Sequence, residues 1–131
     1  MRIDDRDRLE AVGREVIDAS ICVHRTLGPG LLESAYEKAL AIELRRRGIS
    51  CFRQVDVEGF YEGESLGVAF RADLVVEQSI VVELKSVEQI VPLHHAQLRT
   101  YLRLMDLRLG FVINFNVKLL KDGIKRVVNR I

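Results

Sequence analysis

The period of the hydrophobic pattern changes near residue 48, and this change constrains the fold more than any other feature. Before it, apolar residues recur at helical spacing, from Leu9 to Leu27 and again from Leu32 to Leu40. After it, apolar and β-branched residues form shorter runs separated by turn residues, which is typical of strands. The chain is therefore expected to place two helices ahead of a sheet.

Turn residues and helix stops set the predicted boundaries of the elements. Helices are predicted over residues 5–27, 31–47 and 92–105, and strands over residues 52–61, 66–76, 80–87, 109–115 and 124–129. Three consecutive strands favour an antiparallel meander, and the strand–helix–strand step favours a crossover, expected to be right-handed. The order ααβββαββ predicts an α/β fold of the mixed α+β kind, with a sheet of about five strands flanked by helices.

Length and charge narrow the class of protein. The 131 residues suit a single domain over 1–131 with one core. Twenty basic and nineteen acidic residues leave a net charge of +1, so nucleic-acid contact would need local clusters of charge. No apolar run is long enough to span a bilayer, and the charged N-terminus is not a secretory signal. Cys22 and Cys51 lack metal-ligand spacing, so we expect reduced, buried thiols in a cytoplasmic protein.

Asp73, Glu83 and Lys85 interrupt two predicted strands that are otherwise apolar and β-branched. Glu83 and Lys85 are two residues apart, so their side chains project from one face of a strand. A three-residue loop over 77–79 would bring Asp73 opposite Glu83, whereas a two-residue loop would turn Asp73 to the other face. A shared site therefore requires the odd loop or a bulge.

Two carboxylates that face each other across a ladder repel, and a hard divalent cation would remove that cost. Mg²⁺ or Mn²⁺ would be held by carboxylate oxygens, waters and a substrate phosphate, with the backbone carbonyl of Leu84 as a further ligand. Lys85 would orient or deprotonate the attacking water, or stabilise the charge on the phosphate. The alternative is a hairpin face on the surface, with Arg71 forming salt bridges to the acids.

Asp73, followed by Glu83-x-Lys85 on the next strand, resembles the signature of the PD-(D/E)xK nuclease superfamily. The segment Gly30-Leu-Leu-Glu33-Ser-Ala-Tyr36 resembles the motif that names the GxxExxY protein family, a branch of that superfamily. Residues Gln97-x-x-x-Tyr101 resemble the motif on the helix after the catalytic strand in RecB-like nucleases. The resemblance covers about residues 8–130, with Ala72 in place of the proline of the nominal signature.

This resemblance implies a restriction-endonuclease-like core and a metal-dependent site. The implied metal ligands are Asp73, Glu83 and Glu33, the last as an additional acid on the second helix, and Lys85 is the implied catalytic lysine. The implied substrate-positioning residues are Gln97 and Tyr101. Tyr36 lies one helical turn from Glu33, where it either positions substrate at the site edge or packs in the core.

Three functions remain open at this point. The first is a nuclease that uses Mg²⁺ or Mn²⁺ to hydrolyse phosphodiester bonds, with DNA preferred to RNA as the partner, no membrane, and a homodimer as a possible assembly. The second is a catalytically inactive module that binds nucleic acid or a protein. The third is a metal-independent RNA endonuclease, for which His94, Tyr101 and Lys85 would have to meet at one site.

Overall fold

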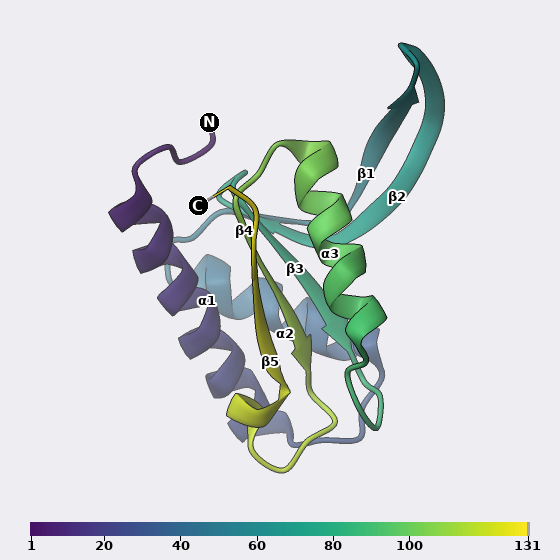
Figure 1. Ribbon diagram of the computed structural model, residues 1–131. Helices are drawn as coiled ribbons and strands as arrows, with labels where there is room; N and C mark the ends of the chain where they lie inside the picture. Colours follow the sequence, from purple (N-terminus) through teal and green to yellow (C-terminus); the bar gives the residue numbers. More distant parts are fainter. Residues whose placement is uncertain (131) are drawn as a thin grey trace.

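The structure, a computed structural model, describes residues 1–130. Its order of elements is the expected ααβββαββ, with one short 3₁₀ helix added (Figure 1). The helices are α1 (Arg6–Leu27), α2 (Glu33–Arg46), α3 (Pro92–Met105) and the 3₁₀ helix η1 (Leu120–Gly123). The strands are β1 (Cys51–Tyr61), β2 (Glu64–Val76), β3 (Ile80–Lys85), β4 (Leu109–Asn114) and β5 (Ile124–Val128).

Local signals account for the ends of α1. Asp5 caps its first turn, since the carboxylate accepts hydrogen bonds from the N–H groups of Asp7 at 2.9 Å and Arg8 at 3.4 Å. Gly28, at a φ of 73°, ends the helix in a conformation that glycine adopts without strain. The helix therefore lies within one residue of its predicted range.

The five strands form one mixed sheet in the order β1-β2-β3-β4-β5. The first three strands pair antiparallel, β3 and β4 pair parallel across the α3 connection, and β4 and β5 pair antiparallel. The predicted meander and crossover connection are thus confirmed. Every residue of β4 is buried, as its apolar sequence indicated.

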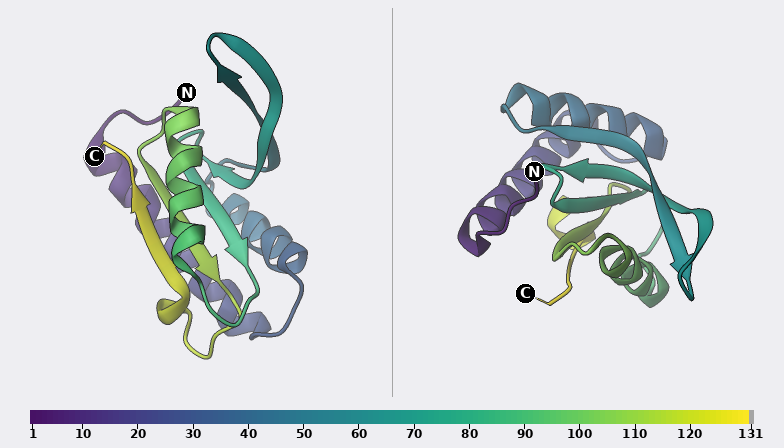
Figure 2. Two further views of the ribbon diagram at one scale, coloured as in Figure 1. Left: turned by 45° about the vertical axis from the view of Figure 1, so that its right-hand side comes forward. Right: turned by 90° about the horizontal axis from the view of Figure 1, so that it is seen from above.

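Helices cover both faces of the sheet. Buried side chains of α1 and α2 pack on one face, and Leu98 and Leu102 of α3 pack on the other (Figure 2). No helix among residues 1–130 is long and apolar enough to cross a membrane. Cys22 and Cys51 are free thiols, as expected, but both are half-buried where full burial was predicted.

The β1–β2 hairpin extends beyond the other strands and curls toward α3 (Figures 1 and 2). Its ladder skips Gln54 and Asp73, and Gln54 has a φ of 52°. Beyond this irregularity the hairpin packs with α3, and Phe70 stacks on Tyr101 with ring centroids 3.7 Å apart. The sheet therefore changes direction at the position of Asp73.

Candidate active site

The connection between β2 and β3 has the three-residue length that a shared site requires. Val76 pairs with Ile80, so residues 77–79 form the loop. Glu77 and Gln78 adopt positive φ values of 50° and 53°, which lets the chain reverse within this short loop. The register that brings Asp73 to Glu83 is therefore present.

The ladder between β2 and β3 ends after the pair Leu74–Val82, whereas β3 stays paired with β4 as far as Lys85. Figure 1 shows β2 turning away from β3 at this level. A split thus opens inside the sheet, and Asp73 and Glu83 are the first residues beyond the last pair.

Asp73 fills this split with its side chain. Its Oδ2 accepts a hydrogen bond from the backbone N–H of Leu84 at 2.9 Å. Its own N–H donates to Oε1 of Glu83 at 3.4 Å. The N–H and C=O of one residue in an extended strand point to the same side, so the carbonyl of Leu84 also faces the split. Carboxylate and carbonyl oxygens thus gather where ladder hydrogen bonds would otherwise form.

Glu83 is buried without a cation of the chain to pair with it. Its exposed fraction is only 8%. Burial, and then the charge of Asp73, raises the pKa of Glu83 to about 9, and nearby Lys85 offsets this only in part. Among residues 1–130, no lysine, arginine or histidine nitrogen lies within 4.0 Å of either carboxylate. The predicted alternative, in which Arg71 pairs with these acids, is wrong because Arg71 binds Asp56 at 2.5 Å on the exposed hairpin.

Gln97 and Tyr101 lie one turn apart on α3, and Tyr101 packs in the cluster between α3 and the β1–β2 hairpin. Burial raises the pKa of the Tyr101 hydroxyl, and the charges of Glu83 and Asp73 raise it further. Gln97, one helical turn earlier, interacts with Tyr101 and has an exposed side chain. His94 instead accepts a hydrogen bond at Nδ1 from the N–H of Val91 at 3.2 Å, which stabilises the start of α3.

Glu33 lies at the end of β3, apart from the two central acids. It is the first residue of α2, and its Oε2 accepts a hydrogen bond from the N–H of Ser86 at 3.3 Å. Together with Ser34 and Asn116 these residues line an open cavity of about 630 Å³. In the part of the chain that the structure describes, no three His, Cys, Asp or Glu side chains lie close enough together to hold a metal ion.

Tyr36 lies in the core and does not reach this surface. It is 0% exposed, and its hydroxyl donates to the carbonyl of Gly28 at 2.6 Å and accepts from the N–H of Leu31 at 3.0 Å. Its ring stacks on Phe115 with centroids 4.5 Å apart. The core-packing alternative therefore describes Tyr36, and the substrate-positioning prediction does not.

Two residues that support Asp73 were not anticipated. The amide nitrogen of Gln54 donates to Oε2 of Glu37 at 2.8 Å and to Oδ1 of Asp73 at 3.4 Å. Glu37 is buried and also binds Arg53 at 3.1 Å. The signal for Glu37 was an acid one turn after Glu33, in the stripe of α2 that continues with buried leucines.

Asn114 holds the loop that follows Lys85. Its buried amide accepts from the N–H of Val87 at 3.1 Å and donates to the carbonyl of Val87 at 2.8 Å. Asn114 is also the register partner of Lys85, the last residue of β3, so it helps to fix where β3 ends. A polar residue at the end of the apolar run 109–113 was the available signal.

The donor set fits a hard divalent cation. Mg²⁺ is usually bound by one or two carboxylates together with waters and substrate phosphates, and does not need a cage of three acids. Asp73, Glu83 and the Leu84 carbonyl provide such oxygen donors. Glu83, buried beside a second acid without an ion pair, is the group whose ionisation a cation would favour.

Comparison with known proteins agrees with this geometry. The model of the PD-(D/E)XK nuclease superfamily matches residues 10–127, which is nearly the whole chain. No curated protein and no solved structure gives a significant match. The matched range contains every site residue described above, while the assignment to the GxxExxY branch stays a prediction.

Proposed function

Because the chain belongs to the PD-(D/E)XK nuclease superfamily, we propose that it hydrolyses phosphodiester bonds of DNA with the help of Mg²⁺ or Mn²⁺. The observation that carries this proposal is the meeting of Asp73 and Glu83 in the split between β2 and β3. Nucleases of this superfamily generally use divalent metal ions. None of the proposed site residues suggests a membrane as substrate.

Each side chain has a proposed task. Asp73, Glu83 and the Leu84 carbonyl hold the cation, and Glu33 is an outer acid at the end of β3. When bound, the cation polarises the phosphate and makes water a better nucleophile at neutral pH. Lys85 shares a strand face with Glu83, so it can orient the attacking water or stabilise the negative charge that develops on the phosphate.

The helix α3 provides the substrate side of the site. Tyr101 donates its hydroxyl to the sugar-phosphate backbone, and Gln97 adds an exposed amide next to it. Stacking on Phe70 fixes the Tyr101 ring, so little conformational freedom is lost when substrate binds. Glu37 and Gln54 act through Asp73 and are positioning residues.

The test is a cleavage assay on labelled single-stranded, duplex and flapped DNA and on RNA, with Mn²⁺, Mg²⁺ or EDTA. We expect metal-dependent cleavage that falls by roughly 100-fold or more in Asp73→Asn and Lys85→Ala. The control is Asp56→Asn, an exposed carboxylate on the same hairpin, which should leave the rate unchanged. Absence of cleavage on all substrates, or equal rates in all variants, would refute the proposal.

One observation favours a second function, a module that binds a protein partner. The hairpin exposes Phe60, Tyr61, Leu66 and Val68, all more than half accessible. Apolar residues gathered at an exposed tip are typical of interaction surfaces. Calorimetric titration with Mn²⁺ separates the two functions, because a binding module needs no metal site, whereas the nuclease must bind the cation and lose it in Asp73→Asn.

A further inference from the structure

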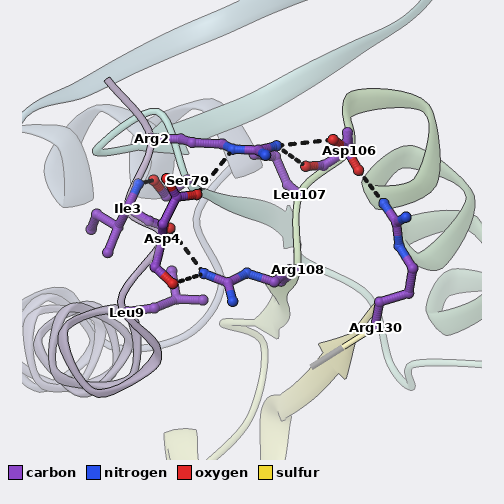
Figure 3. A pocket seen from close by; sticks show the side chains of 9 residues that line it. All are labelled: Arg2, Ile3, Asp4, Leu9, Ser79, Asp106, Leu107, Arg108 and Arg130. Carbon is purple, nitrogen blue, oxygen red and sulfur yellow. Dashed lines mark hydrogen bonds and ion pairs between the residues drawn. The ribbon is translucent and has the colours of Figure 1, made fainter.

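Three arginines near the N-terminal segment, Arg2, Arg108 and Arg130, already bind other groups of the protein. Arg2 and Arg130 both bind the carboxylate of Asp106. Arg108 donates to two backbone carbonyls of the N-terminal segment, at 3.1 and 2.6 Å (Figure 3). These three arginines line a cavity of about 390 Å³ and hold the N-terminal segment against the turn after α3, and two of them form ion pairs with Asp106.

The opposite end of the sheet carries cations without such partners. Arg25 lies in the last turn of α1, and Lys118 and Lys121 lie on the connection between β4 and β5. All three are exposed, and within residues 1–130 none has a carboxylate oxygen within 4.0 Å. They line one cavity of about 300 Å³, so they form a single cationic patch, here called the α1–η1 patch.

This patch lies at the same end of the sheet as the candidate active site. Strands β3 and β4 are parallel, so the loops that follow them leave from one edge (Figures 1 and 2). Asn116 lines the cavity that contains Glu33 and Ser86, and only Val117 separates it from Lys118 of the patch. The cavity at Glu33 and the α1–η1 patch therefore lie next to each other at the end of the sheet where β3 and β4 terminate.

The backbone that presents the patch is held rigidly. Nε2 of buried His24 is 2.8 Å from the carbonyl oxygen of Val117, which ties the β4–β5 connection to α1. Leu120 is buried in the core. At Gly123 an added Cβ would lie 2.2 Å from the carbonyl oxygen of Asn114, so the connection returns tightly against β4. Because this backbone is already ordered, phosphate binding would cost mainly the conformational freedom of the side chains.

We propose that the α1–η1 patch binds phosphates of the nucleic-acid strand beyond the cleaved bond, so that the substrate lies along the carboxyl edge of the sheet. The position of the cleaved bond in this proposal rests on the proposed nuclease function. Such contacts position the strand without reading its sequence. At the opposite end the hairpin tip carries the exposed acids Glu62 and Glu64, which repel a polyanion.

The test measures binding of fluorescent single-stranded and duplex oligonucleotides by anisotropy in EDTA, where cleavage cannot occur, over a range of salt concentrations. The variant replaces all three patch residues: Arg25→Ala, Lys118→Ala and Lys121→Ala. Each lost phosphate contact lowers the slope of log K against log salt by roughly 0.7 to 0.9. We expect the slope to fall by about 2 to 3 and affinity at low salt to fall roughly 10-fold or more.

A matched control removes the same charge elsewhere: Arg6→Ala, Arg8→Ala and Arg45→Ala, all exposed and without ion pairs within residues 1–130. Equal slopes of log K against log salt in the two triple variants would refute the proposed phosphate-binding role of the α1–η1 patch. If the patch variant loses its fold, the single variant Lys118→Glu replaces it, with the same criterion. Cleavage is measured separately. If the patch variant binds more weakly but the wild type cleaves no substrate, only the nuclease proposal is refuted. If the wild type cleaves but the patch variant binds as well as the control, only the phosphate-binding role of the patch is refuted.

Discussion

At the scale of single residues, Glu83 has the most unusual environment among the described side chains of the site. An isolated carboxylate in a protein interior is costly unless a cation or several hydrogen-bond donors compensate it. Here the nearest partner is a second acid, Asp73, and the compensation from Lys85 is partial. Without a cation the folded protein therefore holds a proton on Glu83 at neutral pH. Binding a divalent cation would release that proton.

The raised pKa predicts how stability depends on pH in EDTA. The unfolded chain loses the Glu83 proton near the ordinary value of 4.5, and the folded protein loses it near 9. Between these values the folded state binds more protons, so this contribution to stability is full below the lower value and falls as pH rises. Relative to Glu83→Gln, the wild type should lose more than about 1.4 kcal/mol of unfolding free energy between about pH 5 and about pH 8.

Urea unfolding of both proteins at each pH measures this difference. The control Asp56→Asn changes an exposed carboxylate that pairs with Arg71, and its difference from the wild type should stay nearly constant over the same range. A parallel pH response in Glu83→Gln and the wild type would show that Glu83 is ionised in the folded protein at neutral pH.

At the scale of elements, the site exists because β2 leaves β3 while β3 continues beside β4. The irregularity at Gln54 turns the hairpin toward α3, and the side chain of Asp73 then satisfies the N–H of Leu84 that the departing strand no longer contacts. Two further loops lie beside the site at the end of β3: the α1–α2 loop, which Tyr36 holds by hydrogen bonds, and the loop after β3, which Asn114 holds by hydrogen bonds.

The role of Tyr36 in the α1–α2 loop leads to a prediction for Tyr36→Phe. Removing the hydroxyl leaves the carbonyl of Gly28 and the N–H of Leu31 without their partner. We expect the unfolding free energy to fall by about 0.5–1.5 kcal/mol and amide exchange to accelerate at Leu31, with cleavage changed little at saturating substrate. Loss of cleavage at unchanged stability would instead support the substrate-positioning role. Tyr61→Phe, on the exposed hairpin, is the control.

At the scale of the whole molecule, the net charge is only +1, but the charges are distributed differently at the two ends of the sheet. Near the N-terminal segment Arg2 and Arg130 pair with Asp106, the hairpin tip carries the exposed acids Glu62 and Glu64, and within residues 1–130 the cations of the α1–η1 patch have no ion pair. Such an arrangement orients an approaching polyanion even when the total charge is small. It also places the attractive end where the parallel strands β3 and β4 end, next to the proposed site.

Metal binding should stabilise the whole fold by mass action. A ligand present at about 100 times its Kd adds about 2.7 kcal/mol, which for a chain of this length should raise Tm by several degrees. We expect Mn²⁺ to raise the Tm of the wild type, and to do so more at higher pH, since Glu83 must give up its proton. Thermal scans with Mn²⁺ and with EDTA, at several pH values, measure this rise in Tm. An equal rise in Asp73→Asn would place the metal elsewhere.

The sequence by itself determined the elements and their order. Local signals act within a few residues: turn residues, helix stops and the change of hydrophobic period sufficed for the ααβββαββ order. The shared face of Glu83 and Lys85 also followed from local geometry, as did the condition that a three-residue loop is needed to align Asp73. The length of that loop was decided by the structure. The family resemblance, confirmed at the level of the superfamily, rests on the same short motifs.

Only the tertiary structure decided which side chains meet. The interaction of Gln54 with both Glu37 and Asp73 joins a helix and two strands, and no spacing in the chain predicts it. Tyr36 and Glu33 share a motif, yet packing buries one and exposes the other. The physical reason is that contacts between distant segments depend on how the sheet twists and splits, which is set by the sum of many packing interactions and not by local propensity.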